Sequence, residues 1–123
     1  MQFYKCLNCD DVALKLGKRD ALLSCCDERM KKLIPGEVDA ATEKHVPILH
    51  RDGNKIEVKV GEVEHPMTEE HFIEWIVVET ETGFMTAYLT PKDKPEATFY
   101  TEENVVNVFA YCNLHGLWKS DRQ

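Results

Sequence analysis

The cysteines of this 123-residue chain fall into two groups, and the grouping limits how the first part of the chain can fold. Four of them crowd the first 26 residues and one stands alone near the other end: Cys6, Cys9, Cys25, Cys26 and Cys112. An odd number fits a disulfide framework poorly. A short segment with few apolar side chains also seldom folds without a metal, a disulfide or a partner. The sequence therefore predicts a small metal-binding module over residues 1–36, which ends at the turn signal Pro35-Gly36.

The spacing of the first four cysteines suits a single metal ion. Cys6 and Cys9 can offer two thiolates from one tight loop, and the adjacent pair Cys25-Cys26 can offer two more. Four thiolates around one ion make a tetrahedral site suited to iron or to zinc, and the ligand set leaves that choice open. Free thiols or a disulfide are the alternatives, and both are less expected in a chain without a secretion signal.

Residues 37–123 follow the two-residue period of β-strands. Ile56, Val58 and Val60 alternate with charged side chains, which predicts a half-buried strand. The run 72–78 is apolar on both faces and is expected centrally in a sheet, with 84–89 as its hairpin partner. Further strands are expected over 97–100 and 105–111, and no amphipathic helix of ten or more residues is found. Short strands separated by turns at a spacing of about 10 residues predict an all-β sandwich.

The charge and the apolar runs exclude two kinds of partner. The net charge is −7, from 22 acidic and 15 basic residues, whereas nucleic-acid binders usually present a basic surface. No apolar run approaches the roughly 18–20 residues of a membrane span. The segment Met1–Cys6 has neither the basic start nor the apolar stretch of a secretory signal. We therefore expect a cytoplasmic protein that binds neither nucleic acid nor membranes.

Four of the five histidines and the last cysteine lie in three short motifs. These are Glu43-Lys44-His45-Val46-Pro47, the segment His65-Pro66-Met67 through His71, and Cys112-Asn113-Leu114-His115-Gly116. Any one motif is modest, because a lone histidine in a loop or at the head of a strand is more often an ordinary hydrogen-bonded residue. Together, imidazoles with one thiolate suit a redox-active transition metal better than a closed structural zinc. Five protein ligands on an octahedral ion leave one position open. His71 is expected on the strand face of Ile73 and Trp75, and His50 at the surface beside a turn.

Taken together, these motifs resemble the desulfoferrodoxin branch of the superoxide reductases over essentially the whole chain. Residues 1–36 are similar to its desulforedoxin-type module, through Tyr4-Lys5-Cys6-x-x-Cys9 and Cys25-Cys26-x-x-x-Met30. Residues 37–123 are similar to its neelaredoxin-type catalytic domain, through the three histidine motifs and Ile73-Glu74-Trp75-Ile76. The resemblance implies an immunoglobulin-like β-sandwich with a small N-terminal rubredoxin-like module.

The resemblance also implies two irons per chain. The ligands of the catalytic iron would be four equatorial histidines and an axial thiolate: His45, His65, His71, His115 and Cys112. The rubredoxin-like iron would be held by Cys6, Cys9, Cys25 and Cys26, where zinc remains an alternative. Glu43 matches the glutamate that can occupy the sixth position of the ferric catalytic iron. Lys44 matches the lysine beside the open site.

The implied activity is that of an oxidoreductase for superoxide detoxification: the one-electron reduction of superoxide to hydrogen peroxide. A small carrier such as rubredoxin would supply the electrons, and the chain would form a homodimer. Family members usually have glycine after the second cysteine and after the cysteine pair, where this chain has Asp10 and Asp27. That departure bears on the potential and the iron loading of the first site. Three other functions remain open: an electron-transfer iron protein without substrate turnover, a zinc-stabilised interaction module, and superoxide dismutation.

Overall fold

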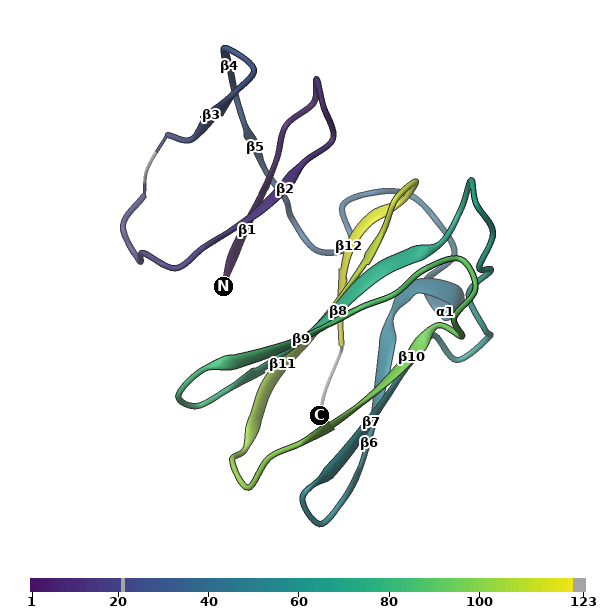
Figure 1. The fold of residues 1–123 in the computed structure, drawn as a ribbon. Helices are drawn as coiled ribbons and strands as arrows, with labels where there is room; N and C mark the ends of the chain where they lie inside the picture. The colour runs from purple at the N-terminus through teal and green to yellow at the C-terminus, as the bar shows by residue number, and fades with distance from the viewer. Residues whose placement is uncertain (21, 121–123) are drawn as a thin grey trace. The chain divides into compact units, whose positions relative to one another are not determined.

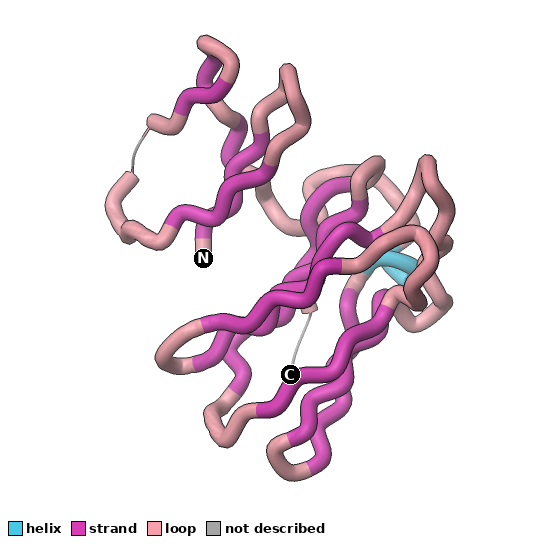
Figure 2. The backbone as a smooth tube through the Cα atoms, in the orientation of Figure 1, coloured by secondary structure: helices cyan, strands magenta, loops and turns pink. Residues whose placement is uncertain are grey.

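The structure is a computed structural model that describes residues 1–20 and 22–120. It divides into two compact units, Met1–Ile34 and Pro35–Gln123, close to the boundary expected after residue 36. In both units the described residues are mainly strands and loops, and the one short helix lies in the second (Figure 2). This helix, α1 (Thr42–His45), has four residues. The described part of the chain therefore has no helix that is long enough to cross a membrane.

The first unit is a small sheet with a two-stranded ladder beside it. Strand β1 (Gln2–Lys5) pairs with β2 (Val12–Lys15) on one side and with β5 (Lys31–Lys32) on the other. The ladder consists of β3 (Ser24–Cys25) and β4 (Glu28–Arg29). Its buried apolar residues among those described are Phe3, Tyr4 and Cys6. So small a core agrees with the expectation that this unit needs a bound metal to be stable.

The second unit is a sandwich of two antiparallel sheets (Figure 1). One sheet has the order β10-β7-β6, with β10 (Glu96–Tyr100), β7 (Lys55–Val60) and β6 (Pro47–Asp52). The other has the order β12-β11-β8-β9, with β12 (Gly116–Lys119), β11 (Val105–Cys112), β8 (Ile73–Thr80) and β9 (Phe84–Tyr88). Side chains of both sheets, among them Ile56, Ile76 and Val108, form one buried cluster. The all-β sandwich predicted from the sequence is confirmed.

All five strands expected in the second unit are present, and two further strands of that unit were missed. Strand β7 alternates between exposed and buried side chains, β8 lies between β11 and β9, and Val77 is paired with Thr86 in the expected hairpin. His50 is exposed, as expected, but it belongs to β6, a strand that the sequence analysis did not predict. Strand β12 was also missed, because it is only four residues long and begins at the last residue of the final histidine motif.

A β-bulge corrects the expected orientation of β8. On β11, the neighbours Tyr111 and Cys112 are paired with Trp75 and Ile73, so the register with β11 skips one β8 residue between these two. Because consecutive residues of β11 point to opposite faces, Ile73 and Trp75 do so too. The expectation that they share a face was therefore wrong. The bulge places Ile73 and Cys112 together on the core side of the sheet.

Candidate metal centres

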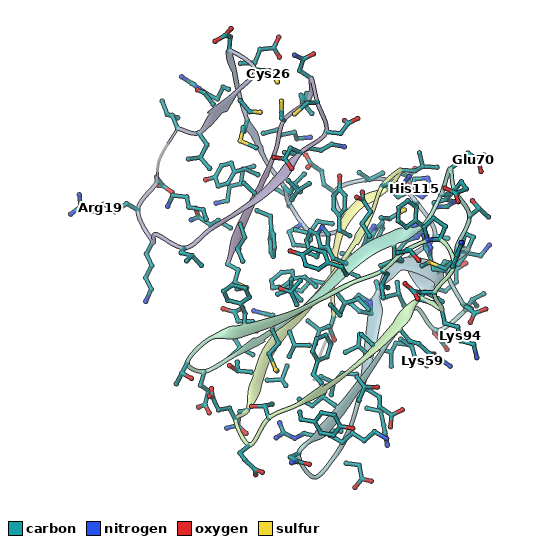
Figure 3. All side chains as sticks on the ribbon, in the orientation of Figure 1. Arg19, Cys26, Lys59, Glu70, Lys94 and His115 are labelled. Atoms are coloured by element: carbon teal, nitrogen blue, oxygen red, sulfur yellow. The ribbon has the colours of Figure 1, made fainter. Side chains whose placement is uncertain are left out.

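The three histidine motifs meet at one end of the sandwich. His45 is the last residue of α1, His65 follows β7, and His71 precedes β8 by two residues. Cys112 is the last residue of β11, and His115 lies in the turn between β11 and β12. Figure 3 labels His115 and Glu70 at this end of the sandwich. Five residues spread over 71 positions of the sequence are thus brought together by strand ends and turns.

The four imidazole rings form a closed cycle. In the order His45, His65, His71, His115 and back to His45, neighbouring ring centroids are 4.6–4.9 Å apart and neighbouring planes meet at 79–88°. Across the cycle, the centroids of His45 and His71 are 6.2 Å apart and their planes are within 27° of parallel. Four rings that are each perpendicular to the next surround one point, as four equatorial ligands would.

Backbone carbonyl groups fix the tautomers of two of these rings. Nδ1 of His45 lies 2.7 Å from the carbonyl oxygen of Ala41, and Nδ1 of His65 lies 2.6 Å from that of Pro66. A carbonyl oxygen only accepts hydrogen bonds, so Nδ1 carries the proton and Nε2 keeps a lone pair. The two Nε2 atoms lie 3.1 Å apart, and Nδ1 of His115 lies 3.1 Å from Nε2 of His45. Lone pairs at this distance repel each other unless a cation lies among them.

A fourth nitrogen and a sulfur complete the set. Nε2 of His71 is buried and has no hydrogen-bond partner within the described part of the chain. Leaving such an atom unsatisfied costs about 1–3 kcal/mol. Ligand atoms of His45, His65, His71 and Cys112 all lie within 4.8 Å of one another. A metal ion bound by these atoms would remove both the repulsion and the unsatisfied nitrogen, so the donor set fits a transition metal.

Burial controls the protonation of this centre. It lowers the pKa of His65 to about 4 and also lowers the pKa of His45 and His71, so these rings are neutral at pH 7 and able to bind a metal. Burial raises the pKa of the Cys112 thiol, and the backbone N–H groups of His115 and Leu114 oppose that rise. The N–H of His115 lies 3.4 Å from Sγ of Cys112. A bound metal would hold this sulfur as a thiolate.

Lys44, which the family resemblance places beside the open site, lies near the four histidines. After burial and the charge of other histidines, the charge of Lys44 contributes to lowering the pKa of His45 and His71, so its ammonium group is within electrostatic range of the centre. Lys44 and His65 line an open groove of about 440 Å³, which Lys94 also lines. The groove gives small solutes a path toward the histidines from the side of Lys44.

The structure does not bring the Glu43 side chain to the histidines. Glu43 is exposed on α1 and lines a separate groove of about 190 Å³ together with Val46 and Glu62. Its backbone is nonetheless fixed, because its carbonyl oxygen accepts a 2.8 Å hydrogen bond from the N–H of Val63. A role for the Glu43 carboxylate at the metal would require α1 or the side chain to change conformation.

Three residues that the sequence analysis missed hold this centre in place. Trp118 stacks on His45 with ring centroids 4.9 Å apart, and its Nε1–H donates to the carbonyl oxygen of His115. The Oδ1 atom of Asn113 accepts from the N–H of Phe72, and its Nδ2 group donates to the carbonyl oxygen of Glu70. These bonds tie the segment between the last two ligands to the segment around His71. The only available signal was that Asn113 stands between Cys112 and His115.

Gly61 is the third of these residues. A Cβ atom there would lie 2.8 Å from the carbonyl oxygen of Glu43 and 2.9 Å from the carbonyl carbon of Lys44. Only glycine allows the backbone after β7 to approach α1 this closely. No pattern in the sequence selects Gly61, because the contact joins segments that are separated in the chain.

The four N-terminal cysteines form a second group. Their sulfur atoms lie within 4.8 Å of one another, with 3.7 Å between Cys9 and Cys25 and 3.8 Å between Cys25 and Cys26. All are free thiols, and Cys9 and Cys26 are exposed while Cys6 is buried. The N–H of Cys9 lowers the pKa of Cys6 to about 7, whereas interactions with neighbouring thiols, that of Cys6 first, raise the pKa of Cys25 to about 12. Four converging thiols fit one tetrahedral ion.

Comparison with known proteins agrees with both sites. A sequence model described as Desulfoferrodoxin matches residues 37–121. A desulfoferrodoxin from Clostridium acetobutylicum is 46% identical over 123 residues, which cover 98% of this chain and 96% of that protein. The chain belongs to the desulfoferrodoxin family. It is also similar in structure to the superoxide reductase from Treponema pallidum, with a TM-score of 0.81 and 34% identity over 97% of this chain and 98% of that one.

A second solved structure matches only part of this chain. The one-iron superoxide reductase from Giardia intestinalis is 33% identical and covers 63% of this chain and 95% of its own, with a TM-score of 0.54. The four-cysteine group and the group of four histidines and one cysteine match the two-iron arrangement of desulfoferrodoxins. The predictions of the family, of the β-sandwich with its N-terminal four-cysteine site and of two irons per chain are thus confirmed.

Proposed function

We propose that this desulfoferrodoxin is a superoxide reductase. In the reaction, superoxide takes up one electron and two protons and becomes hydrogen peroxide, and no oxygen is released. The single observation that carries the proposal is the closed cycle of four imidazoles with the buried Cys112 sulfur beside it. Five ligands on a six-coordinate ion leave one position for a small anion, which a closed structural site would not have.

The ligands of the catalytic iron are proposed to be His45, His65, His71, His115 and Cys112. A ferrous ion bound by them supplies the electron, and the thiolate of Cys112 increases the electron density available at the metal. The neutral histidines leave the thiolate as the one anionic ligand. The two carbonyl groups of Ala41 and Pro66 keep the metal-binding nitrogens of His45 and His65 unprotonated.

Lys44 is proposed to capture the substrate. Superoxide is an anion and the protein carries a net charge of −7, so long-range attraction is absent. A local positive charge must therefore act over the last ~10 Å, about one Debye length at an ionic strength of 0.1 M. Lys44 lies on the exposed side of α1, next to the open groove that leads to His65. We propose that it attracts the anion there and stabilises its charge until protons arrive from water.

Glu43 is proposed to be a ligand of the ferric state only. Its side chain lies on the neighbouring groove, so it leaves the substrate position free in this conformation. Because α1 is a single turn of four residues, a small change in its conformation would redirect the carboxylate. A hard carboxylate oxygen suits the more highly charged ferric ion better than the ferrous ion.

The N-terminal module, expected over residues 1–36, is proposed to relay electrons to the catalytic domain over 37–123. Four thiolates suit an iron that changes oxidation state without binding substrate. Cys9 and Cys26 are exposed, so a partner can approach the site closely, and we propose a small rubredoxin-like donor. We also propose a homodimer, from the family resemblance, and a cytoplasmic location, which fits five reduced cysteines.

The test is the product yield of the iron-loaded, pre-reduced protein when it is mixed with a limiting amount of superoxide. A reductase yields one peroxide per superoxide and no oxygen. Dismutation yields half as much peroxide together with oxygen. An electron-transfer protein without substrate chemistry leaves the spontaneous reaction unchanged, and a zinc-stabilised module contains no iron at all. Each of the last three results would reject the proposal.

Two variants make this test specific to the catalytic centre. Cys112→Ser removes the thiolate and is expected to abolish the reductase yield. Cys26→Ser alters the four-cysteine site only and should leave the first turnover of the pre-reduced protein intact. If both variants kept the full yield, the reaction would not take place at the proposed centre.

A further inference from the structure

Left-handed backbone at residues other than glycine is confined to the four-cysteine site. Within residues 1–20 and 22–120, the non-glycine residues with positive φ are Asp10 (65°), Cys26 (53°) and Asp27 (59°). The other positive-φ positions there are glycines: Gly36, Gly53 and Gly116. Left-handed backbone is disfavoured for residues with a side chain, although aspartate tolerates it better than most. Each aspartate directly follows a metal-binding cysteine, so the strained backbone coincides with a carboxylate on the residue next to that cysteine.

The turns themselves are built around the metal site. The N–H of Asp10 donates to the carbonyl oxygen of Cys6 at 2.9 Å, and the N–H of Cys9 lies 3.4 Å from Sγ of Cys6. Glycine would make the same turn without strain, because the hydrogen bonds involve only backbone groups and sulfur. The side chains of Asp10 and Asp27 are exposed and are not needed to complete the turns. What they add is charge.

We propose that Asp10 and Asp27 lower the reduction potential of the iron in the four-cysteine site. Four thiolates already give this site a negative net charge in both oxidation states, and reduction adds one more electron. Carboxylates next to the cysteines oppose that added charge and so stabilise the ferric form. Net charge and solvent exposure are among the main determinants of the potential of thiolate-bound iron. The inference rests on the iron of this site and its proposed role as an electron relay, but not on reaction with superoxide.

The two aspartates should not contribute equally. An oxygen of Asp10 lies 3.7 Å from Nζ of Lys5, whose positive charge partly cancels that of the carboxylate. For Asp27, no Lys, Arg or His nitrogen of the described residues lies within ion-pair distance. Asp27 therefore acts with its full charge and is expected to have the larger effect. A lower potential makes the relay iron a stronger electron donor to the catalytic centre, and it requires a strongly reducing partner to refill it.

The experiment is a spectroelectrochemical titration of the thiolate bands of the full-length, iron-loaded protein. Asp27→Asn and Asp10→Asn remove the charge but keep a side chain that tolerates left-handed backbone. We expect the potential to become more positive in both variants, more so in Asp27→Asn, with the double variant close to the sum. Because both side chains are exposed, the shifts should shrink in 1 M salt, where screening acts over about 3 Å.

Asp20→Asn is the matched control, because it removes the same charge from an exposed position of the same unit. Figure 3 labels its neighbour Arg19 at the end of this unit away from Cys26. The reduction potential of the four-cysteine site in Asp20→Asn should equal that in the parent protein. The proposal is overturned if Asp27→Asn shifts the potential no more than this control, or if the shift persists unchanged in high salt.

Iron content per chain separates this result from a failure to fold or to load. If Asp27→Asn binds less iron, Asp27→Gly takes its place, since glycine makes the turn without strain. A site that fills with zinc in the parent protein, with no thiolate-to-iron bands, would overturn the inference while leaving superoxide reduction at the catalytic centre intact.

Discussion

The α-carbon of Gly61 lies against the backbone of Glu43, so closely that a methyl group there would come within 2.8 Å of the Glu43 carbonyl oxygen. The same oxygen accepts the N–H of Val63 at 2.8 Å. The N–H of His65 in turn donates to the carbonyl oxygen of Val60. One bend after β7 therefore fixes both the position of α1, which carries Lys44 and His45, and the position of His65.

Gly61→Ala should disturb the catalytic centre from outside it. The added methyl group must displace the backbone of α1, and such overpacking typically costs about 1–3 kcal/mol. Because the displaced segment carries Lys44 and His45, we expect slower superoxide capture and an altered ferric spectrum as well as a lower Tm. Gly83→Ala is the matched control, since a Cβ there meets no atom within 4 Å. Equal behaviour of the two variants would contradict this role of Gly61.

Lys44→Ala should slow the second-order capture of superoxide by about tenfold or more, within the range for local electrostatic steering. Rapid mixing with pulse-generated superoxide at several ionic strengths measures this, and the salt dependence of the rate should also weaken. Lys55→Ala is the control, because Lys55 starts β7 whereas the centre lies beyond the end of that strand. An unchanged capture rate in Lys44→Ala would remove the steering role.

Glu43→Ala should change the visible spectrum of the ferric protein more than it changes the rate of superoxide capture. If the carboxylate is a ligand only after oxidation, its loss leaves the ferrous centre and its capture rate nearly intact. The visible spectrum of the ferric form should shift, and azide or cyanide should bind to it more tightly. Identical ferric spectra with and without Glu43 would show that the carboxylate never reaches the metal.

Asn113→Ala should loosen the catalytic metal. It removes two side-chain hydrogen bonds, to Phe72 and Glu70, at a cost of about 1 kcal/mol each. The two lost bonds join the segment between Cys112 and His115 to the segment around His71, so a chelator should remove iron from the variant several times faster. Asn107→Ala, which loses a bond to Glu79 inside the same sheet, should lose stability without faster iron release. Equal release rates would make Asn113 an ordinary stabilising residue.

Glu103→Gln should lose stability in a manner that depends on pH. The side-chain hydroxyl and the backbone N–H of Thr82 both donate to the Glu103 carboxylate and lower its pKa. A carboxyl group with a lowered pKa stabilises the fold above its unfolded pKa, and that stability is lost as the pH falls through the folded value. The parent protein should therefore unfold at higher urea than Glu103→Gln at pH 7, and the difference should be smaller at pH 3, which lies below the usual pKa of a glutamate. A constant difference at both pH values would contradict this.

The sequence was sufficient for the parts of the fold that depend on local pattern. The alternation in β7 and the apolar run of β8 gave correct strands, because side-chain period follows directly from backbone geometry. The bulge opposite Tyr111 and Cys112 could not be predicted, since no local residue preference marks the position at which the register shifts. Strand β6 begins at Pro47, the last residue of a histidine motif, and its mixed side chains do not stand out as a strand.

In the candidate sites, too, the features that depend on local pattern could be predicted and those that depend on tertiary contacts could not. The ligand residues could be selected by chemical type and spacing, but nothing in the sequence showed that His115 turns Nδ1, rather than Nε2, toward His45. Supporting residues such as Trp118 and Gly61 act through contacts between distant segments, which a sequence pattern does not contain. The Glu43 side chain was expected beside the metal and lies on a separate groove, because the orientation of a four-residue helix depends on tertiary packing.

The burial of Cys112 determines which part of this protein is oxidised first. Its sulfur atom belongs to the hydrophobic core and is fully shielded from solvent, whereas Cys9 and Cys26 lie at the surface. Peroxide attacks thiolates that it can reach, and successive oxidation converts them into acids that no longer bind iron. The enzyme's own product is therefore a greater hazard to the electron relay than to the catalytic thiolate. Oxidative damage should begin at the cysteines of the N-terminal module, while the catalytic centre is still active.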